Sequence, residues 1–333
     1  MATNRQVMIA SVPQGPLEAR HFELRESEAP SPAEGQVLVA TIALTIGAGQ
    51  RAGLQGSASY AGAPQSGIVM NGTGVARVVE SRAPGFASGD LVVAPSGWQE
   101  LSVHKPGALR KVDVSVDPAH HLGMLGTNGL TAYFGLLALG EPKAGQTVVV
   151  SAAAGSVGHI VGQIAKLKGC RVVGVAGSDE KGRILTGELG FDAAVNYKSA
   201  SFRDDFKAAT PDRINVYFDN TGGPILESAL FRMAPHGRII CCGNVSQYDT
   251  ATPAAGPRGV PGLLVNNRVR MEGFLVFDYA DRYEEARAEM TEWVRSGALV
   301  PRVSEYQGLA QAPQAFVDLL AGRNIGTTVV RVG

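Results

Sequence analysis

The residues of this chain with the clearest chemical potential form a short run of small side chains. Ala153, Gly155 and Gly158 match a G-x-G-x-x-G pattern in which alanine takes the first place. Small side chains there let the backbone approach a pyrophosphate closely, and the N-terminus of a following helix offers it free N–H groups and a positive dipole end. The run predicts the phosphate-binding turn of a dinucleotide site. The alternative is a tight strand-to-helix turn that binds nothing.

The turn has the flanking elements that such a site needs. A β-branched run at 146–150 predicts a strand before it, 160–168 predicts a helix after it, and 170–176 predicts a second strand at βαβ spacing. Because a glycine pattern is informative only between a strand and a helix, this context favours a nucleotide site over an empty turn.

The end of the second strand indicates which dinucleotide binds. NAD sites place an acid there for the ribose hydroxyls, whereas NADP sites place positive charge for the 2′-phosphate. Here Gly177 and Ser178 follow the strand, and Lys181 comes soon after. This favours NADP. In the alternative, Lys181 is a solvated lysine at a helix start, and Asp179 or Glu180 holds the ribose.

The inventory of possible ligands argues against metal chemistry. The chain has three cysteines, Cys170, Cys241 and Cys242, and none in its first half. His120 and His121 are the only clustered histidines, and adjacent side chains point in different directions on a helix or a strand. Catalytic zinc is therefore not expected. A structural zinc lobe with four cysteine ligands is excluded by the cysteine count.

Composition narrows the class of protein. The 333 residues suffice for two domains, and 30 basic residues balance 30 acidic ones, so nucleic acid and anionic membranes are not expected partners. No apolar run approaches about 18 residues, and residues 1–6 lack the apolar core of a signal peptide, so we expect neither a membrane span nor secretion. Three cysteines without a disulfide pattern favour a reducing compartment, and we expect a cytoplasmic protein.

Two rhythms along the chain predict two domains. Short apolar runs separated by Pro and Gly predict a small, partly open β-barrel over residues 1–126. Alternating strands and helices over 127–298 predict a doubly wound parallel sheet of the Rossmann type, with later strands at 191–197, 214–219, 237–243 and 269–276. The tail, 299–333, is expected to complete the first domain. Two glycine-rich segments, 55–67 and 247–267, are expected to be loops, the second covering the active site.

Several longer stretches resemble one known family. They are GLTAYFGL at 129–136, VSAAAGSVG at 150–158, GSDEK at 177–181, FDNTGG at 218–223, CGNVSQY at 242–248 and MEGF at 271–274. On these residues the chain is identified as a member of the zinc-independent medium-chain dehydrogenases/reductases. Within them it resembles the leukotriene B4 12-hydroxydehydrogenase/prostaglandin reductase group, which includes alkenal double-bond reductases and curcumin reductase. The resemblance implies a GroES-like barrel domain beside the Rossmann domain.

The resemblance also implies which residues bind the cofactor, NADPH/NADP+. Ser178, Lys181 and Tyr197 would hold the 2′-phosphate, and a C-terminal asparagine, Asn324, would contact the cofactor. The full implied set is Thr131, Ala154, Gly155, Ser156, Val157, Gly158, Gly177, Ser178, Lys181, Tyr197, Asn220, Cys242, Gly243, Val245, Ser246, Phe274, Leu275, Val276 and Asn324.

The implied activity is reduction of a C=C bond conjugated to a carbonyl, with hydride delivered to the β-carbon. Tyr248 is the implied catalytic residue, because a hydroxyl aimed at the carbonyl oxygen stabilises the charge of the developing enolate. The proton for the α-carbon comes from Tyr248 or from water. In the alternative, Tyr248 packs on the cofactor without donating, since a phenol with a pKa of about 10 is a poor acid.

The expected partners are a small enone or enal and a second copy of the chain. A homodimer seam is expected near 269–276, because unpaired sheet edges invite pairing. Three other functions stay open. They are an NADPH quinone oxidoreductase of the same superfamily, a carbonyl-reducing alcohol dehydrogenase, which the lack of zinc ligands argues against, and a non-enzymatic NADPH-binding protein.

The first domain departs from the family pattern at one place. Where the family carries Asp-Pro-Tyr-Met-Arg, this chain reads Gly47-Ala48-Gly49-Gln50-Arg51, so only Arg51 is kept. Loss of the tyrosine implies a wider or differently shaped substrate pocket. The resemblance therefore does not identify the physiological substrate.

Overall fold

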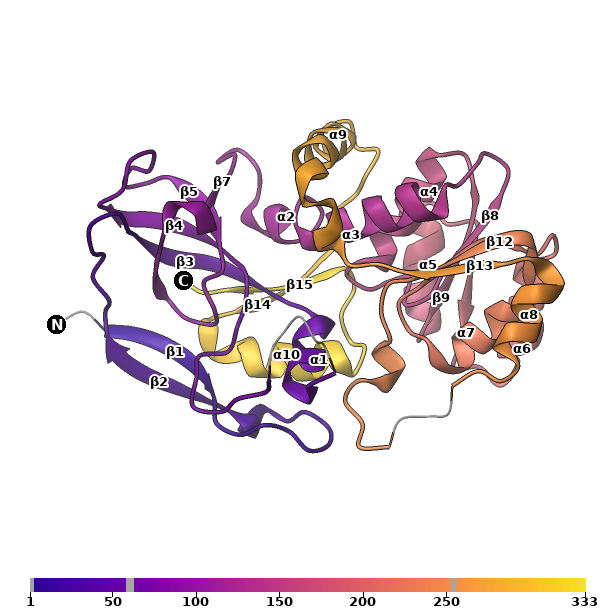
Figure 1. Cartoon of the computed structure of the whole chain (residues 1–333), viewed down its shortest axis with the longest axis horizontal. Helices are drawn as coiled ribbons and strands as arrows, with labels where there is room; N and C mark the ends of the chain where they lie inside the picture. The colour runs from indigo at the N-terminus through magenta and orange to yellow at the C-terminus, as the bar shows by residue number, and fades with distance from the viewer. Residues whose placement is uncertain (1–2, 58–62, 253–255) are drawn as a thin grey trace. The chain divides into compact units, whose positions relative to one another are not determined.

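The computed structural model describes residues 3–57, 63–252 and 256–333, and the chain divides into two compact units (Figure 1). Unit 1 comprises Met1–Gly123, Asp249–Ala251 and Val303–Gly333, and unit 2 comprises Met124–Tyr248 and Thr252–Arg302.

Unit 1 is built on strands from both ends of the chain. Its strands are β1 (Thr3–Ile9), β2 (Phe22–Glu28), β3 (Val37–Ile46), β4 (Gly74–Ser81), β5 (Leu91–Ala94), β6 (Leu101–His104), β7 (Arg110–Lys111), β14 (Val303–Gln307) and β15 (Thr327–Arg331). Its helices are η1 (Ala19–His21), α1 (Ala48–Gln55), η3 (Pro106–Ala108), α2 (Pro118–Leu122), η7 (Leu309–Gln311) and α10 (Ala312–Leu320). The larger sheet runs in the order β14-β15-β3-β4-β5-β7, with β6 also paired with β3, and β1 and β2 form a separate two-stranded sheet. Since β15 pairs antiparallel with β3, the C-terminal tail is part of unit 1.

The core of unit 1 contains a cluster of three aromatic rings. Trp98 is fully buried, and its ring centroid lies 5.3 Å from that of Phe22 and 5.8 Å from that of Phe316. Phe22 begins β2 and Phe316 lies in α10, so this cluster packs the hairpin and the C-terminal helix together. Tilted and edge-on ring contacts of this kind add to the free energy of burial.

Unit 2 alternates strands and helices. Its strands are β8 (Thr147–Val150), β9 (Arg171–Ala176), β10 (Ala193–Asn196), β11 (Ile214–Asp219), β12 (Met233–Cys241) and β13 (Arg270–Gly273). Its helices are α3 (Thr127–Phe134), η4 (Gly135–Gly140), α4 (Gly158–Leu167), α5 (Asp179–Glu188), α6 (Phe202–Ala209), α7 (Gly223–Leu230), η5 (Val245–Gln247), α8 (Val260–Asn267), η6 (Val276–Arg282) and α9 (Tyr283–Arg295). The sheet is parallel throughout, in the order β10-β9-β8-β11-β12-β13, which is the doubly wound Rossmann order.

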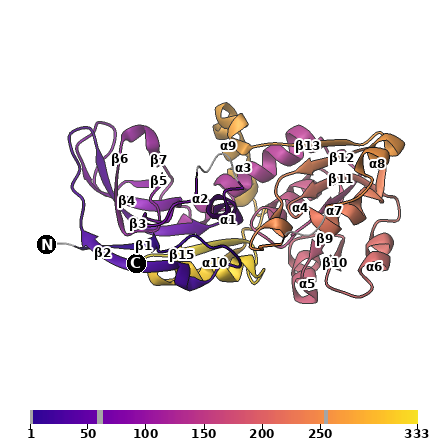
Figure 2. The same ribbon diagram turned by 60° about the horizontal axis from the view of Figure 1, so that its bottom comes forward.

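The sequence of β8 explains why it lies at the centre of this sheet. All four of its residues, TVVV, are buried. A parallel strand that is covered on both faces reads as a continuous β-branched run, because neither face alternates with solvent. Figure 2 shows the helices of unit 2 on the two sides of the sheet, with α8 beside β12 and β13.

The fold class predicted from the sequence is confirmed: a Rossmann sheet in one unit and a mixed, mostly antiparallel sheet in the other. Two local predictions were wrong. Residues 260–267, expected in a loop, form α8, because Pro261 suits the first turn of a helix and Leu263 and Leu264 pack against the sheet core. Strand β12 begins at Met233 rather than 237, so α7 ends at Leu230. Residues 58–62 and 253–255 of the two expected loops lie outside the described residues.

The homodimer seam predicted near 269–276 falls on β13, the last strand in the sheet order. The dimer itself stays a prediction, which the mass of the protein in solution would check. Among the described residues, no helix has the length and apolar character needed to cross a bilayer.

Candidate functional site

The phosphate-binding turn joins β8 to α4. Within it, Ala152 adopts a φ of +46°, and its carbonyl accepts a hydrogen bond of 2.9 Å from the N–H of Gly155. A Cβ on Gly158 would lie 2.3 Å from that carbonyl oxygen and 2.8 Å from the Cα of Ala153. Glycine is therefore required at 158 for the helix to start this close to the turn, which is the close approach that the glycine pattern predicts.

No side chain caps the N-terminus of α4, so the backbone N–H groups of its first turn can act as donors to a ligand. Val157 is the N-cap residue. Ala153 and Ala154 are buried beneath the turn, and the N–H of Ala153 donates to the carbonyl of Val175 in β9 at 2.9 Å. The predicted residues Ala154, Gly155, Ser156, Val157 and Gly158 thus lie together in the turn and at the helix start. An uncapped helix N-terminus with small residues fits a pyrophosphate.

Four predicted residues meet at the end of β9. Ser178 is the N-cap of α5, and its Oγ accepts a hydrogen bond of 3.3 Å from the N–H of Lys181. A Cβ on Gly177 would lie 3.2 Å from Cε1 of the Tyr197 ring, so this ring lies against the backbone of Gly177. The structure therefore brings Gly177, Ser178, Lys181 and Tyr197 to one place.

Lys198 joins this group and was missed in the sequence. Its Nζ lies 5.8 Å from the centroid of the Tyr197 ring, and its Cε lies 3.6 Å from the Cβ position of Gly177. Burial lowers the pKa of Lys181, and the positive charge of Lys198 lowers that pKa further. Two lysines whose charges interact fit a dianion such as a ribose 2′-phosphate. The feature of the sequence that could have indicated Lys198 is its position directly after Tyr197.

The acidic alternative at this place is weakened by a contact of Asp179. Its Oδ1 accepts a hydrogen bond of 2.9 Å from Nδ2 of Asn196, at the end of β10. Asp179 thus ties α5 to the neighbouring strand. Because Asp179 is engaged in this contact, Lys181 and Lys198 are the charged groups that favour a phosphorylated ribose over a free one.

At the switch point of the sheet, the residues after β8 and β11 are joined directly. The backbone N–H of Asn220 donates to Oγ of Ser151, and Nδ2 of Asn220 donates to the Ser151 carbonyl, both at 2.8 Å. The hydroxyl of Ser151 donates to Oδ1 of Asp219 at 3.1 Å. Burial raises the pKa of Asp219, although it accepts several such hydrogen bonds. Ligands of open α/β sheets bind in the crevice at this point.

The loop after β12 is attached to the end of β11. The N–H groups of Cys242 and Gly243 both donate to the Asp219 carbonyl, at 2.9 and 3.1 Å. Val245 donates to the Asn220 carbonyl at 3.2 Å, and Ser246 to the Thr221 carbonyl at 3.0 Å. These bonds place Cys242, Gly243, Val245 and Ser246 beside Asn220. Tyr248 then ends the η5 turn, with its N–H donating to the Val245 carbonyl at 3.1 Å.

Cys241, the last residue of β12, and Cys242, the first of the loop, are not poised as nucleophiles. Burial and the nearby Asp219 carboxylate raise the pKa of Cys242 to about 12 and that of Cys241 to about 11. The thiolate is the nucleophilic form of cysteine, so both side chains act here as small lining groups.

The remaining predicted residues of unit 2 lie on α3 and at the end of β13. The hydroxyl of Thr131 donates to the Thr127 carbonyl at 2.7 Å within α3, and α3 packs against both α4 and η6. A Cβ on Gly135 would lie 2.6 Å from the Phe274 ring. Leu275 is exposed, whereas Val276 is buried and its carbonyl accepts a hydrogen bond of 3.0 Å from the Tyr283 hydroxyl.

The predicted contact of Asn324 with the cofactor stays a prediction. Asn324 lies in unit 1, where it is buried and its Nδ2 donates to the Gly326 carbonyl at 2.9 Å. Over the described part of the chain, no three His, Cys, Asp or Glu side chains gather closely enough to hold a metal ion.

Comparisons with known proteins agree with this geometry. Residues 5–112 match the family described as the N-terminal domain of oxidoreductase, and 156–293 match the family described as zinc-binding dehydrogenase. The chain is 41% identical to the NADPH-dependent curcumin reductase of Escherichia coli (strain K12), over 99% of this chain and 97% of the relative. It is 44% identical to a 2-alkenal reductase (NADP(+)-dependent) of Nicotiana tabacum, over 82% of this chain and 80% of the relative. Among solved structures, CurA of Vibrio vulnificus in complex with NADPH matches with a TM-score of 0.95 and 38% identity, over 99% of each chain.

Proposed function

Since this chain belongs to the zinc-independent medium-chain dehydrogenases/reductases, in the group of NADPH-dependent double-bond reductases, we propose that it uses NADPH to reduce the C=C bond of α,β-unsaturated ketones and aldehydes. The observation that supports this most is the switch point, where Ser151 and Asn220 join the ends of β8 and β11. The loop that carries Tyr248 is attached to the same end of β11. A nicotinamide ring and a tyrosine hydroxyl are thereby expected side by side.

The residues of this chain fit the cofactor at both of its charged ends. Gly155 and Gly158, in a turn that a larger side chain would disrupt, would hold the pyrophosphate at the start of α4. Ser178, Lys181, Tyr197 and Lys198 would hold the 2′-phosphate. When bound, NADPH supplies the hydride that goes to the β-carbon of the substrate.

The protein then has to stabilise charge on the substrate. As the β-carbon accepts hydride, negative charge develops on the carbonyl oxygen, and the enzyme needs a donor aimed at that oxygen. We assign this role to the Tyr248 hydroxyl, which the loop at 242–246 holds through four backbone hydrogen bonds to the residues after β11. The α-carbon takes its proton from Tyr248 or from water.

Replacing Lys181 by Met is expected to raise the Kd and KM for NADPH about 10- to 100-fold and to leave those for NADH unchanged. A hydrogen bond to a charged group contributes about 1.5–3 kcal/mol, and each 1.4 kcal/mol is about tenfold in affinity. Lys198→Met is expected to act in the same direction. Cofactor titration followed by protein fluorescence, together with steady-state kinetics, measures both effects.

Lys207, an exposed lysine of α6, supplies the matched control. Lys207→Met should leave both cofactors unaffected. Equal loss of NADPH and NADH binding in Lys181→Met would contradict the 2′-phosphate assignment, because NADH carries no phosphate there.

The reaction is tested by following NADPH oxidation against enones, enals, quinones and simple ketones, with the products identified by mass. We expect consumption with enones and enals, saturated carbonyl products and a marked preference for NADPH over NADH. Turnover of quinones alone would assign the protein to the quinone oxidoreductases, and alcohol products would indicate carbonyl reduction. No turnover with tight NADPH binding would indicate a non-enzymatic role.

A further inference from the structure

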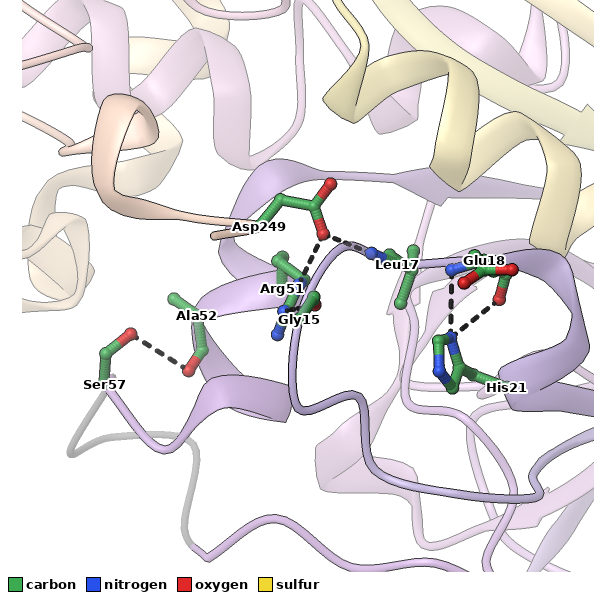
Figure 3. A network of polar contacts seen from close by, with 8 residues as sticks. All are labelled: Gly15, Leu17, Glu18, His21, Arg51, Ala52, Ser57 and Asp249. Atoms are coloured by element: carbon green, nitrogen blue, oxygen red, sulfur yellow. Dashed lines mark hydrogen bonds and ion pairs between the residues drawn. The ribbon is translucent and has the colours of Figure 1, made fainter. Parts of the chain in front are cut away.

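Arg51 is a buried cation in unit 1 with no place in the proposed chemistry. It lies in α1, and its side chain is only 1% exposed. Its Nε donates to Oδ1 of Asp249 at 3.0 Å, and its Nη2 donates to the Gly15 carbonyl at 2.7 Å (Figure 3). Its Nη1 is also buried and finds no partner among the described residues. Burying a guanidinium costs desolvation free energy, and buried ion pairs can often be replaced by apolar side chains without loss of stability. The burial of Arg51 therefore points to a role other than stability.

Asp249 is the centre of the contact. The same Oδ1 that accepts from Arg51 accepts from the N–H of Leu17 at 2.5 Å, so one carboxylate holds α1 and the segment at 15–17 together (Figure 3). Asp249 has a φ of +58°, in the left-handed region that side chains other than glycine seldom adopt. The two hydrogen bonds hold the backbone in this conformation.

The position of Asp249 in the chain connects this contact to Tyr248. Asp249 directly follows Tyr248, and the chain passes from unit 2 to unit 1 between these two residues. On the N-terminal side, the N–H of Tyr248 is bonded to the Val245 carbonyl. On the C-terminal side, the next Cα is about 3.8 Å away and belongs to the anchored Asp249. The Tyr248 backbone is thus restrained from both sides.

We propose that Arg51 and Asp249 are positioning residues for Tyr248, an inference that rests on the proposed function of that tyrosine. The carboxylate of Asp249 fixes the backbone beside Tyr248, and Arg51 fixes the carboxylate. Neither side chain touches the reacting atoms in this scheme. They act by fixing the position and orientation of the Tyr248 hydroxyl. A displacement of a catalytic group by about 1 Å can lower the rate about 100-fold.

The sharpest variant is Asp249→Gly, because glycine adopts a positive φ without strain and only the carboxylate anchor is lost. We expect kcat to fall roughly 10- to 100-fold, with the Kd for NADPH unchanged. Arg51→Met should also lower kcat. Asp249→Asn keeps a hydrogen-bond acceptor, so it should lower kcat less than Asp249→Gly does. The exposed pair of Arg82 and Glu80 supplies the control, since Arg82→Met removes an arginine–carboxylate ion pair at the surface and should leave kcat unchanged.

The decisive comparison repeats Asp249→Gly in a Tyr248→Phe background. If Asp249 acts through the Tyr248 hydroxyl, its replacement should have no further effect on kcat there, because residues that act as a unit are not additive. The same fold-loss in both backgrounds would indicate a merely structural role and overturn the proposal. Thermal unfolding and NADPH titration verify that each variant is folded, and if Asp249→Gly fails this check, Asp249→Asn carries the test.

The outcomes separate this inference from the proposed function. A wild-type protein that turns over no enone overturns both, and full activity in Tyr248→Phe overturns the role of that tyrosine and the positioning role with it. If kcat is lowered in Tyr248→Phe but not in Asp249→Gly, only the positioning role is overturned.

Discussion

Replacing Tyr248 by Phe is expected to lower kcat for enones about 100-fold, which corresponds to about 2.7 kcal/mol of lost transition-state stabilisation. Phenylalanine keeps the aromatic ring but removes the hydroxyl that would donate to the enolate oxygen. The interaction is made mainly in the transition state, so kcat and kcat/KM should fall together. Steady-state kinetics with one enone and one enal measure the change.

NADPH affinity separates the two roles considered for this tyrosine. If the hydroxyl donates, the Kd for NADPH in Tyr248→Phe stays near the wild-type value while turnover falls. If the ring only packs on the cofactor, Phe serves equally well and turnover is unchanged. The second result would remove Tyr248 from the chemistry, and a water molecule would remain as the source of the proton.

Replacing Gly158 by Ala is expected to destabilise unit 2 and to weaken NADPH binding. The new Cβ would lie 2.3 Å from the Ala152 carbonyl oxygen and 2.8 Å from the Cα of Ala153, and both are backbone atoms that no rotamer change can move. Forced overpacking costs about 1–3 kcal/mol of folding stability. The same displacement moves the helix start away from the pyrophosphate, so we expect NADPH affinity to fall more than about tenfold.

Gly187 in α5 provides the matched control for this substitution. A Cβ there meets no atom within 4 Å, and its φ is not positive. Gly187→Ala should therefore leave NADPH binding unchanged and raise the stability by about 0.4–1 kcal/mol, since alanine restricts the unfolded chain. Thermal unfolding and cofactor titration compare the two variants. Equal behaviour of Gly158→Ala and Gly187→Ala would show that the turn tolerates a side chain.

The parts of the molecule that could be predicted from sequence are those that local patterns determine. The turn at 153–158 lies between a buried β-branched strand and a helix, so its conformation follows from residues within a few positions. Lys181 could be proposed as a 2′-phosphate ligand for the same reason, because it follows the second strand closely in the sequence. Lys198 was missed because it approaches Gly177 only when β10 and β9 pair side by side.

Long-range contacts were beyond the reach of the sequence. Arg51 and Asp249 are 198 positions apart, and nothing near either residue indicates the other. Helix α1 was missed because two glycines, at 49 and 53, give its sequence little helical character. Helix α8 was missed because Pro and Gly near its start suggested a loop, whereas the packing of Leu263 and Leu264 decided the outcome.

The ionisation of Cys241 and Cys242 bears on how such an enzyme survives its own substrates. Enones and enals are electrophiles that alkylate thiolates by conjugate addition, and Cys241, at the end of β12, and Cys242, at the start of the next loop, both come shortly before Tyr248. Burial and the Asp219 carboxylate raise the pKa of Cys241 to about 11 and that of Cys242 to about 12, which favours the unreactive thiol form over the thiolate. In the proposed reaction, this burial would limit inactivation of the protein by its own substrate.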